Sequence, residues 1–107
     1  MSVICIHNAT ILAGYAKMDK CAVLVEDGHI VDVFSEKRFV QKRFPSDARI
    51  YDADGSYIAP GFIDTHIHGF AGYCTEDLSV DAIIAMADHL ASFGVTAFCP
   101  TIYPMEP

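Results

Sequence analysis

Two histidines at the end of a short apolar run are the side chains of this chain best suited to chemistry. His66 and His68 are separated by one residue in the sequence Phe-Ile-Asp-Thr-His-Ile-His, which begins at residue 62. Neutral imidazole nitrogens are good ligands for zinc and similar divalent ions. Alternate side chains of a strand point to one face, so the two rings should lie side by side. The spacing therefore predicts two neighbouring nitrogen ligands for one metal ion.

The surroundings of this pair decide between a metal site and ordinary histidines. A lone His-x-His pattern more often marks surface or hydrogen-bonded histidines. Here the pair ends an apolar strand and is followed at once by Gly69 and a loop. This context favours the interpretation that the two histidines are metal ligands. Asp64 precedes the pair on the same face, and we expect it to bond backbone or a ring rather than the metal. His7, His29 and His89 are expected to lie outside the site.

Other catalytic motifs are absent from the sequence. It contains no Gly-x-Ser-x-Gly elbow, no phosphate-binding glycine loop, no dinucleotide fingerprint and no His-Glu-x-x-His helix. Basic residues gather in segment 36–44, where a solvated helix face is a better explanation than a phosphate site. Metal-assisted hydrolysis is therefore the one chemistry with a positive signal, and no catalytic nucleophile or substrate-binding residue can be assigned.

The elements before residue 60 are predicted to be mostly strands. Residues 3–6 and 22–25 are rich in β-formers, and Asp27-Gly28 between two such runs predicts a hairpin. Residues 36–44 should form a short amphipathic helix that ends at Pro45. Asp54-Gly55 predicts a second hairpin or a tight turn.

From residue 62 the pattern becomes strand, loop, helix and strand. The strand should cover 62–68, the loop 69–77, the helix about 80–93 with Ser79 as its N-cap, and the second strand 95–99. A crossover helix favours a parallel pair, with the histidines at the carboxyl end where ligands bind in such sheets. The apolar stripe expected to bury the helix comprises Val80, Ile83, Ile84, Ala87, Leu90 and Ala91.

The length of 107 residues and the 52% of hydrophobic residues are typical of one modest globular domain. The formal charge of −7 disfavours nucleic acid and anionic membranes as partners. The N-terminus does not look like a signal peptide, and no apolar run is long enough to span a bilayer. Four scattered cysteines without a CxxC pair indicate reduced, mostly buried thiols and a cytoplasmic protein.

Several motifs together resemble a known family. Residues 60–69, Pro-Gly-Phe-Ile-Asp-Thr-His-Ile-His-Gly, resemble the opening strand of the amidohydrolase superfamily. The continuations at 68–72, 75–77 and 94–101 are similar to the N-acetylglucosamine-6-phosphate deacetylase family within it. The resemblance covers nearly the whole chain.

The resemblance implies an α/β fold in two parts. Residues 1–59 would be part of a small β-sandwich domain, and residues 60–107 the first β-α-β unit of a metal-dependent (β/α)8 barrel. His66 and His68 would bind a divalent metal ion, zinc or else iron, manganese or cobalt, with one or two ions in a complete site. In the family, metal-activated water attacks the acetamide carbonyl of an amino-sugar phosphate while an aspartate moves protons, and acetate is released.

The length of the chain departs from that family pattern. A (β/α)8 barrel needs about 250 residues, so we interpret the chain as an N-terminal fragment that is inactive alone and self-associates. The first alternative is another amidohydrolase, such as a dihydroorotase-like or hydantoinase-like cyclic amidase. The second alternative is a non-enzymatic β-rich module for metal binding or interaction.

Overall fold

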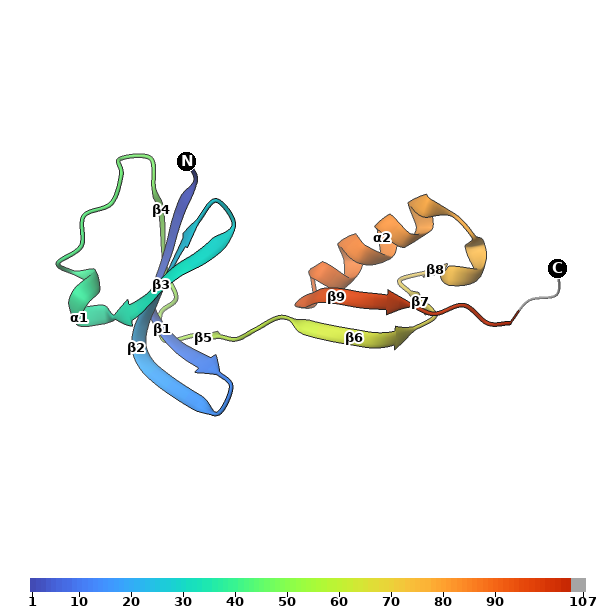
Figure 1. Ribbon diagram of the computed structural model, residues 1–107, viewed down its shortest axis with the longest axis horizontal. Helices are drawn as coiled ribbons and strands as arrows, with labels where there is room; N and C mark the ends of the chain where they lie inside the picture. Colours follow the sequence, from blue (N-terminus) through green and yellow to red (C-terminus); the bar gives the residue numbers. More distant parts are fainter. Residues whose placement is uncertain (105–107) are drawn as a thin grey trace. The chain divides into compact units, whose positions relative to one another are not determined.

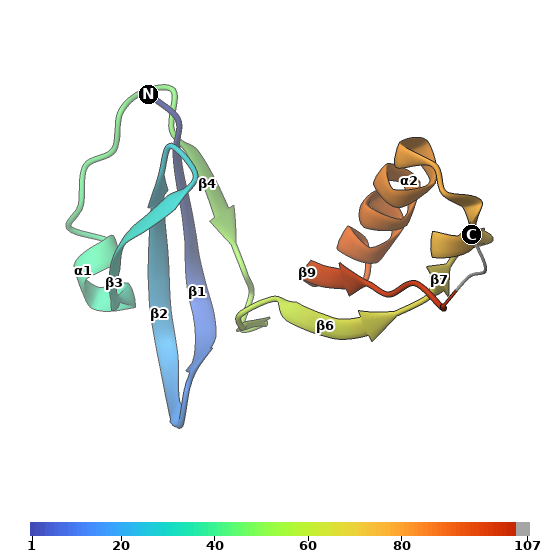
Figure 2. The same cartoon turned by 45° about the vertical axis from the view of Figure 1, so that its right-hand side comes forward.

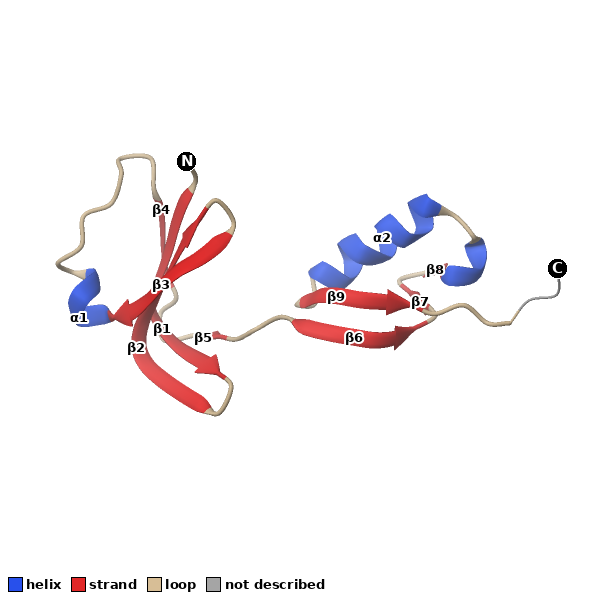
Figure 3. Ribbon diagram, viewed as in Figure 1, coloured by secondary structure: helices blue, strands red, loops and turns tan. Residues whose placement is uncertain are grey.

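The computed structural model describes residues 1–104, which form two compact units (Figures 1 and 2). The first runs from Met1 to Pro60 and the second begins at Gly61. The first is built from strands with one short helix, and the second from short strands with one longer helix (Figure 3). The fold is therefore α/β, as the sequence predicted.

The first unit is one mixed five-stranded sheet. Its strand order is β3-β2-β1-β4, and β5 also pairs with β1. Antiparallel pairing joins β1 to β2 and β2 to β3, while β4 and β5 both run parallel to β1. The strands are β1 (Val3–Ala13), β2 (Ala16–Glu26), β3 (His29–Ser35), β4 (Arg49–Asp52) and β5 (Tyr57–Ile58).

Both Asp-Gly turns form, but only one closes a hairpin. Asp27 and Gly28 have φ of 48° and 82°, as a two-residue turn with positive φ at both positions requires, and they join β2 to β3. Asp54 and Gly55 also turn the chain with positive φ, yet the hairpin alternative is wrong here. The N–H of Gly55 donates to the Asn8 carbonyl oxygen at 2.8 Å, so the flanking strands bond β1 rather than each other.

Helix α1 (Glu36–Phe39) is shorter than the predicted helix over residues 36–44. Ser35 caps it by accepting the Arg38 N–H at 3.2 Å. Phe39 and Phe44 both pack against the core of the sheet, with ring centroids 5.7 Å apart. Side chains five residues apart on a helix diverge by about 140°, so a continuous helix would turn one ring away. The chain therefore leaves the helix after one turn.

The core of the first unit lies on one face of its sheet. It is formed by residues of β1, β2 and β3, namely Val3, Cys5, Ala22, Leu24 and Phe34. A second apolar region includes Ile11, Val23 and Val33, which line an open groove of about 250 Å³. The unit thus has one closed core and one apolar groove that its own residues leave open.

The second unit is a β-α-β unit with a small insertion. Strands β6 (Phe62–Ile67) and β9 (Val95–Pro100) are parallel, as predicted. The segment predicted as a loop contains a small hairpin, β7 (Gly69–Phe70) with β8 (Tyr73–Cys74), and the 3-10 helix η1 (Thr75–Asp77). Helix α2 (Val80–Ala91) begins where predicted, because the Ser79 hydroxyl accepts the Ala82 N–H at 3.4 Å.

The close pairing of β6 and β9 explains the glycine that precedes β6. A Cβ atom at Gly61 would lie 2.8 Å from the Cβ of Thr96 and nearer still to other atoms of that side chain. Side-chain carbons do not approach so closely, so residue 61 must be glycine unless β9 moves. The Pro-Gly step thus allows the two parallel strands to meet at their N-terminal ends.

The buried face of α2 differs from the predicted apolar stripe. Ala82, Met86 and Leu90 are buried, whereas Val80 and Ile84 are 76% and 53% exposed. The predicted stripe is confirmed at Leu90 and in part at Ile83 and Ala87, which are half-buried, but it is wrong at its other positions. Helix α2 is apolar on more than one side, and the side that packs against β7, β8 and β9 is the covered one. Ile63 of β6 is likewise 69% exposed. The second unit therefore presents considerable apolar surface.

Candidate metal centre

The structure brings His66 and His68 together at the carboxyl end of β6. His66 lies within β6, and His68 follows its last residue directly. Their Nε2 atoms are 3.1 Å apart, and the ring planes are inclined by 74°. Two imidazole nitrogens thus converge on one small region, at the end of the parallel pair that the sequence indicated.

The separation of the two nitrogens fits shared binding of one ion. Zinc holds imidazole nitrogen at about 2.0–2.1 Å, and two such ligands at a tetrahedral ion lie roughly 3.3 Å apart. The observed distance is 3.1 Å. Without an ion, one Nε2 must carry a proton and donate it to the other. Both rings could turn their lone pairs to a common ion with little movement.

Asp64 takes the supporting position that the sequence predicted for it. Its Oδ1 accepts the backbone N–H of His66 at 3.1 Å. It therefore braces the strand just before the pair. Within residues 1–104, no group of three or more His, Cys, Asp or Glu side chains is placed to hold a metal ion.

Two residues that sequence analysis missed contact the His68 ring. The Oε1 atom of Glu76 lies 3.9 Å from Nδ1 of His68. The ring of Tyr103 stacks on His68 with centroids 3.9 Å apart and planes inclined by 7°. Glu76 belongs to segment 75–77, which is one of the motifs that resemble the family. Its spacing in the sequence gives no reason to connect it with His68. No sequence motif includes Tyr103. Both contacts depend on how η1 and the segment after β9 fold back.

Thr75 connects the segments that surround His68. It is the one buried polar residue of the described chain, with 3% exposure. Its backbone N–H donates to the His68 carbonyl oxygen at 2.8 Å, and its hydroxyl donates to the Thr101 carbonyl oxygen at 2.6 Å. The end of β6, the start of η1 and the segment after β9 are thereby fixed to one another.

Cys74, the cysteine near the histidine loop, is held as a thiol. The Asp77 carboxylate accepts the Cys74 N–H at 3.0 Å and its Sγ–H at 3.3 Å. These bonds lower the pKa of Asp77, and the bond to Asp77 raises the pKa of Cys74. Metal binding and nucleophilic attack need the thiolate, so Cys74 is poorly suited to either.

All four cysteines are free, as expected, but the prediction that most are buried was wrong. Only Cys5 is buried, and this burial raises the pKa of its thiol. Cys21 and Cys74 are partly covered, and Cys99 on β9 is exposed.

The other histidines make contacts elsewhere in the described part of the chain. His7 contacts Glu36 through Nδ1 at 2.7 Å and stacks on Phe39, which ties α1 to β1. His29 lies beside its turn, with Nδ1 3.1 Å from the Asp27 carbonyl oxygen. His89 is exposed on α2. None of them shares a contact with the His66 and His68 pair.

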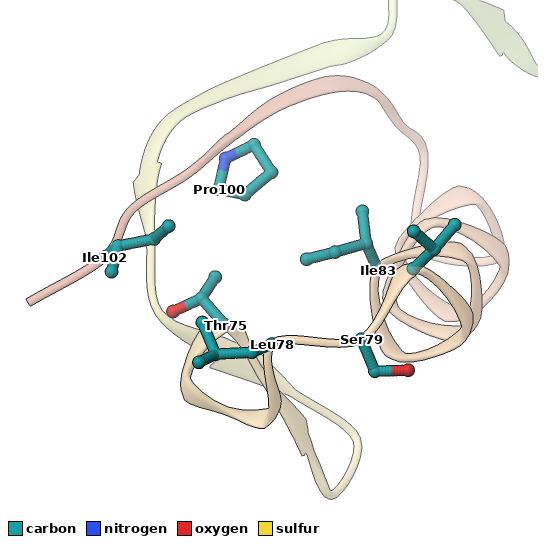
Figure 4. Close-up of a pocket in the computed structure, with 7 residues that line it drawn as sticks. Thr75, Leu78, Ser79, Ile83, Pro100 and Ile102 are labelled. Carbon is teal, nitrogen blue, oxygen red and sulfur yellow. The ribbon is translucent and has the colours of Figure 1, made fainter.

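A pocket beside η1 is lined by apolar and hydroxyl side chains and includes neither His66 nor His68. It has a volume of about 280 Å³. Figure 4 shows side chains from η1, α2 and the segment after β9 around it. Its lining carries no titratable side chain and comprises Thr75, Leu78, Ser79, Val80, Ile83, Pro100 and Ile102.

Among the described residues, no helix has both the length and the apolar character needed to cross a membrane.

Comparisons with known proteins point to one enzyme family. Human N-acetylglucosamine-6-phosphate deacetylase is 38% identical over an alignment of 104 positions, which covers 94% of this chain and 24% of the human protein. The crystal structure of N-acetylglucosamine-6-phosphate deacetylase from Pasteurella multocida has a TM-score of 0.81 at 24% identity, over 94% of this chain and 25% of that one. D-hydantoinase from Thermus has a TM-score of 0.51 at 26% identity, over 65% and 14% of the two chains. No family model matches. The chain spans about a fifth to a quarter of the length of the human and rat relatives that it matches.

Proposed function

Because the chain resembles N-acetylglucosamine-6-phosphate deacetylases over nearly its whole length, we propose that it is part of such an enzyme, a metal-dependent amide hydrolase of the amidohydrolase superfamily. The observation that carries the proposal is the convergence of the His66 and His68 Nε2 atoms at 3.1 Å. Residues 1–59 would form part of the small β-sandwich domain. Residues 60–107 would begin the (β/α)8 barrel, with the histidine pair at its catalytic end.

His66 and His68 would hold a divalent ion through their Nε2 atoms, with zinc the best match to two neutral imidazoles. The ion would supply Lewis acidity toward an amide carbonyl and make bound water more acidic. Asp64 would support the backbone of His66 by accepting its N–H at 3.1 Å. Two imidazoles leave most coordination positions to other groups, so the chain by itself is expected to be inactive.

The proposed substrate is an amino-sugar phosphate that carries an N-acetyl group. This assignment follows the relatives that match at 38% and 39% identity, whose names specify N-acetylglucosamine 6-phosphate. A cyclic amide is the second candidate, because the Thermus D-hydantoinase shares part of the fold. That match covers 65% of the chain, against 94% for the human deacetylase. The deacetylase assignment is therefore favoured.

A chimeric enzyme tests the proposed function directly. The matched segment of the human deacetylase would be replaced by the corresponding residues of this chain. We expect the chimera to bind metal and to release acetate from N-acetylglucosamine 6-phosphate, because the fold and the histidine pair would be retained. Acetate release is measured beside hydantoin ring opening, with the human enzyme as control. A folded, metal-loaded chimera that releases no acetate would contradict the proposal, and one that opens hydantoin would favour the cyclic amidase.

Self-association of the free chain is a further expectation. Val80, Ile84 and Ile63 are exposed in the second unit, and the first has an open apolar groove. Exposed apolar surface of this kind favours association. In sedimentation velocity we expect species larger than the 11.7 kDa monomer, and Ile84→Lys should shift the distribution toward the monomer. Asp88→Lys, an exposed polar position on the same helix, is the matched control. A single sharp monomer boundary at all concentrations would contradict this expectation.

A further inference from the structure

The environment of His68 contains two buried polar atoms that face each other without a hydrogen bond. Nδ1 of His68 and Oε1 of Glu76 are both buried, and neither has a hydrogen-bond partner within residues 1–104. They are 3.9 Å apart, about 1 Å more than a charge-assisted hydrogen bond. A buried polar atom without a partner costs free energy, so contact between these two would satisfy both.

The charge of Glu76 distinguishes the two neutral tautomers of His68. With the proton on Nε2, the Nδ1 lone pair would face a carboxylate oxygen, which is repulsive. With the proton on Nδ1, an N–H points toward Glu76, and the Nε2 lone pair is directed toward Nε2 of His66, 3.1 Å away. Only the second tautomer leaves His68 ready to bind a metal at the point where the two rings converge.

We infer that Glu76 is a positioning residue that holds His68 in the Nδ1–H tautomer and so prepares its Nε2 to bind the metal ion. The inference rests on the proposed function, since it assumes that His68 is a ligand. Ligand histidines commonly donate their second ring N–H to a carboxylate, and this bond fixes the ring and makes the ligand more basic. Glu76 is placed to provide that carboxylate.

The backbone around Glu76 is fixed, so a small side-chain movement can form the bond. The Thr75 N–H donates to the His68 carbonyl oxygen, and the Asp77 carboxylate accepts two hydrogen bonds from Cys74. Glu76 lies between these two anchored residues in η1. Tyr103 covers one face of the His68 ring at 3.9 Å and restricts its rotation. A rotation of the Glu76 carboxylate thus completes the contact without moving the chain.

Nitrogen-15 NMR of the histidine-labelled chain, with zinc alone as the probe, tests the inference. In the zinc-free protein, we expect His68 to carry its proton on Nδ1. Zinc should then shift the Nε2 signals of His66 and His68. Glu76→Ala should give a mixture of tautomers and weaken zinc binding about 10–100-fold, the usual cost of losing such a partner. Glu76→Gln retains an acceptor oxygen and should largely restore the Nδ1–H tautomer, while Asp88→Asn controls for charge.

The outcomes separate this inference from the proposed function. If zinc leaves the His66 and His68 signals unchanged while His68 is in the Nδ1–H tautomer, the metal assignment fails and the tautomer role of Glu76 survives. If zinc binds but Glu76→Ala leaves tautomer and affinity unchanged, Glu76 has no positioning role. If the alanine variant does not fold, the tautomer of His68 measured in the unsubstituted chain tests the inference. An Nε2–H tautomer there would overturn it.

Discussion

Replacing both His66 and His68 with alanine is expected to abolish zinc binding by the chain. The two Nε2 atoms are 3.1 Å apart, and each would contribute one bond to the same ion. Losing an outer partner of a ligand costs about 10–100-fold in affinity, so losing the ligands themselves should cost more than about 100-fold. Isothermal titration with zinc would measure the change, and the same substitutions in the chimera should eliminate acetate release and bound metal together.

The matched control for this experiment is His89→Ala. His89 is exposed on α2, and its substitution removes an imidazole without touching the pair. We expect zinc affinity to remain unchanged in this variant. Equal losses in the control and in the double variant would mean that zinc binds surface histidines indiscriminately. Unchanged binding in the double variant would place the metal elsewhere.

Phe34→Ala should unfold most of the first unit. Phe34 is 4% exposed, and it fills the core between β1, β2 and α1 with Val3, Cys5, Ala22 and Leu24. Truncation of a buried phenylalanine costs about 3–5 kcal/mol. A unit of about 60 residues buries too little surface to absorb such a loss. Amide hydrogen exchange should show that β1 and β2 lose protection in this variant.

Val33→Ala is the matched control for the core substitution. Val33 is the neighbouring residue on β3, is 42% exposed and faces away from the core. Because less apolar surface is lost there, we expect a cost below about 1.5 kcal/mol and retained protection. If both variants unfold alike, the stability of the sheet does not depend on the face that carries Phe34.

Interactions confined to neighbouring residues were predicted correctly from the sequence. Asp27-Gly28 forms its hairpin because both residues accept positive φ, and Ser79 caps α2 because its hydroxyl reaches the Ala82 N–H. Asp64 bonds the backbone two residues further on. Each of these outcomes depends on atoms only a few residues apart, which the order of residue types already determines.

Predictions that needed a distant partner succeeded less often. The sequence could not reveal that β4 and β5 would both pair with β1, or that Phe39 and Phe44 would share one core and shorten α1. The buried face of α2 was also decided by the strands beneath it. Several faces of that helix are apolar, so periodicity alone could not choose among them.

The same division holds at the candidate metal centre. The sequence alone determined that His66 and His68 would lie side by side, because strand geometry places alternate residues on one face. Only the tertiary structure brought Glu76 to Nδ1 of His68 and Tyr103 onto its ring. Those contacts require η1 and the segment after β9 to fold back on the end of β6, and Thr75 fixes that fold with hydrogen bonds to His68 and Thr101. Local spacing thus determined which histidines are paired, and long-range packing decided which groups contact one of them.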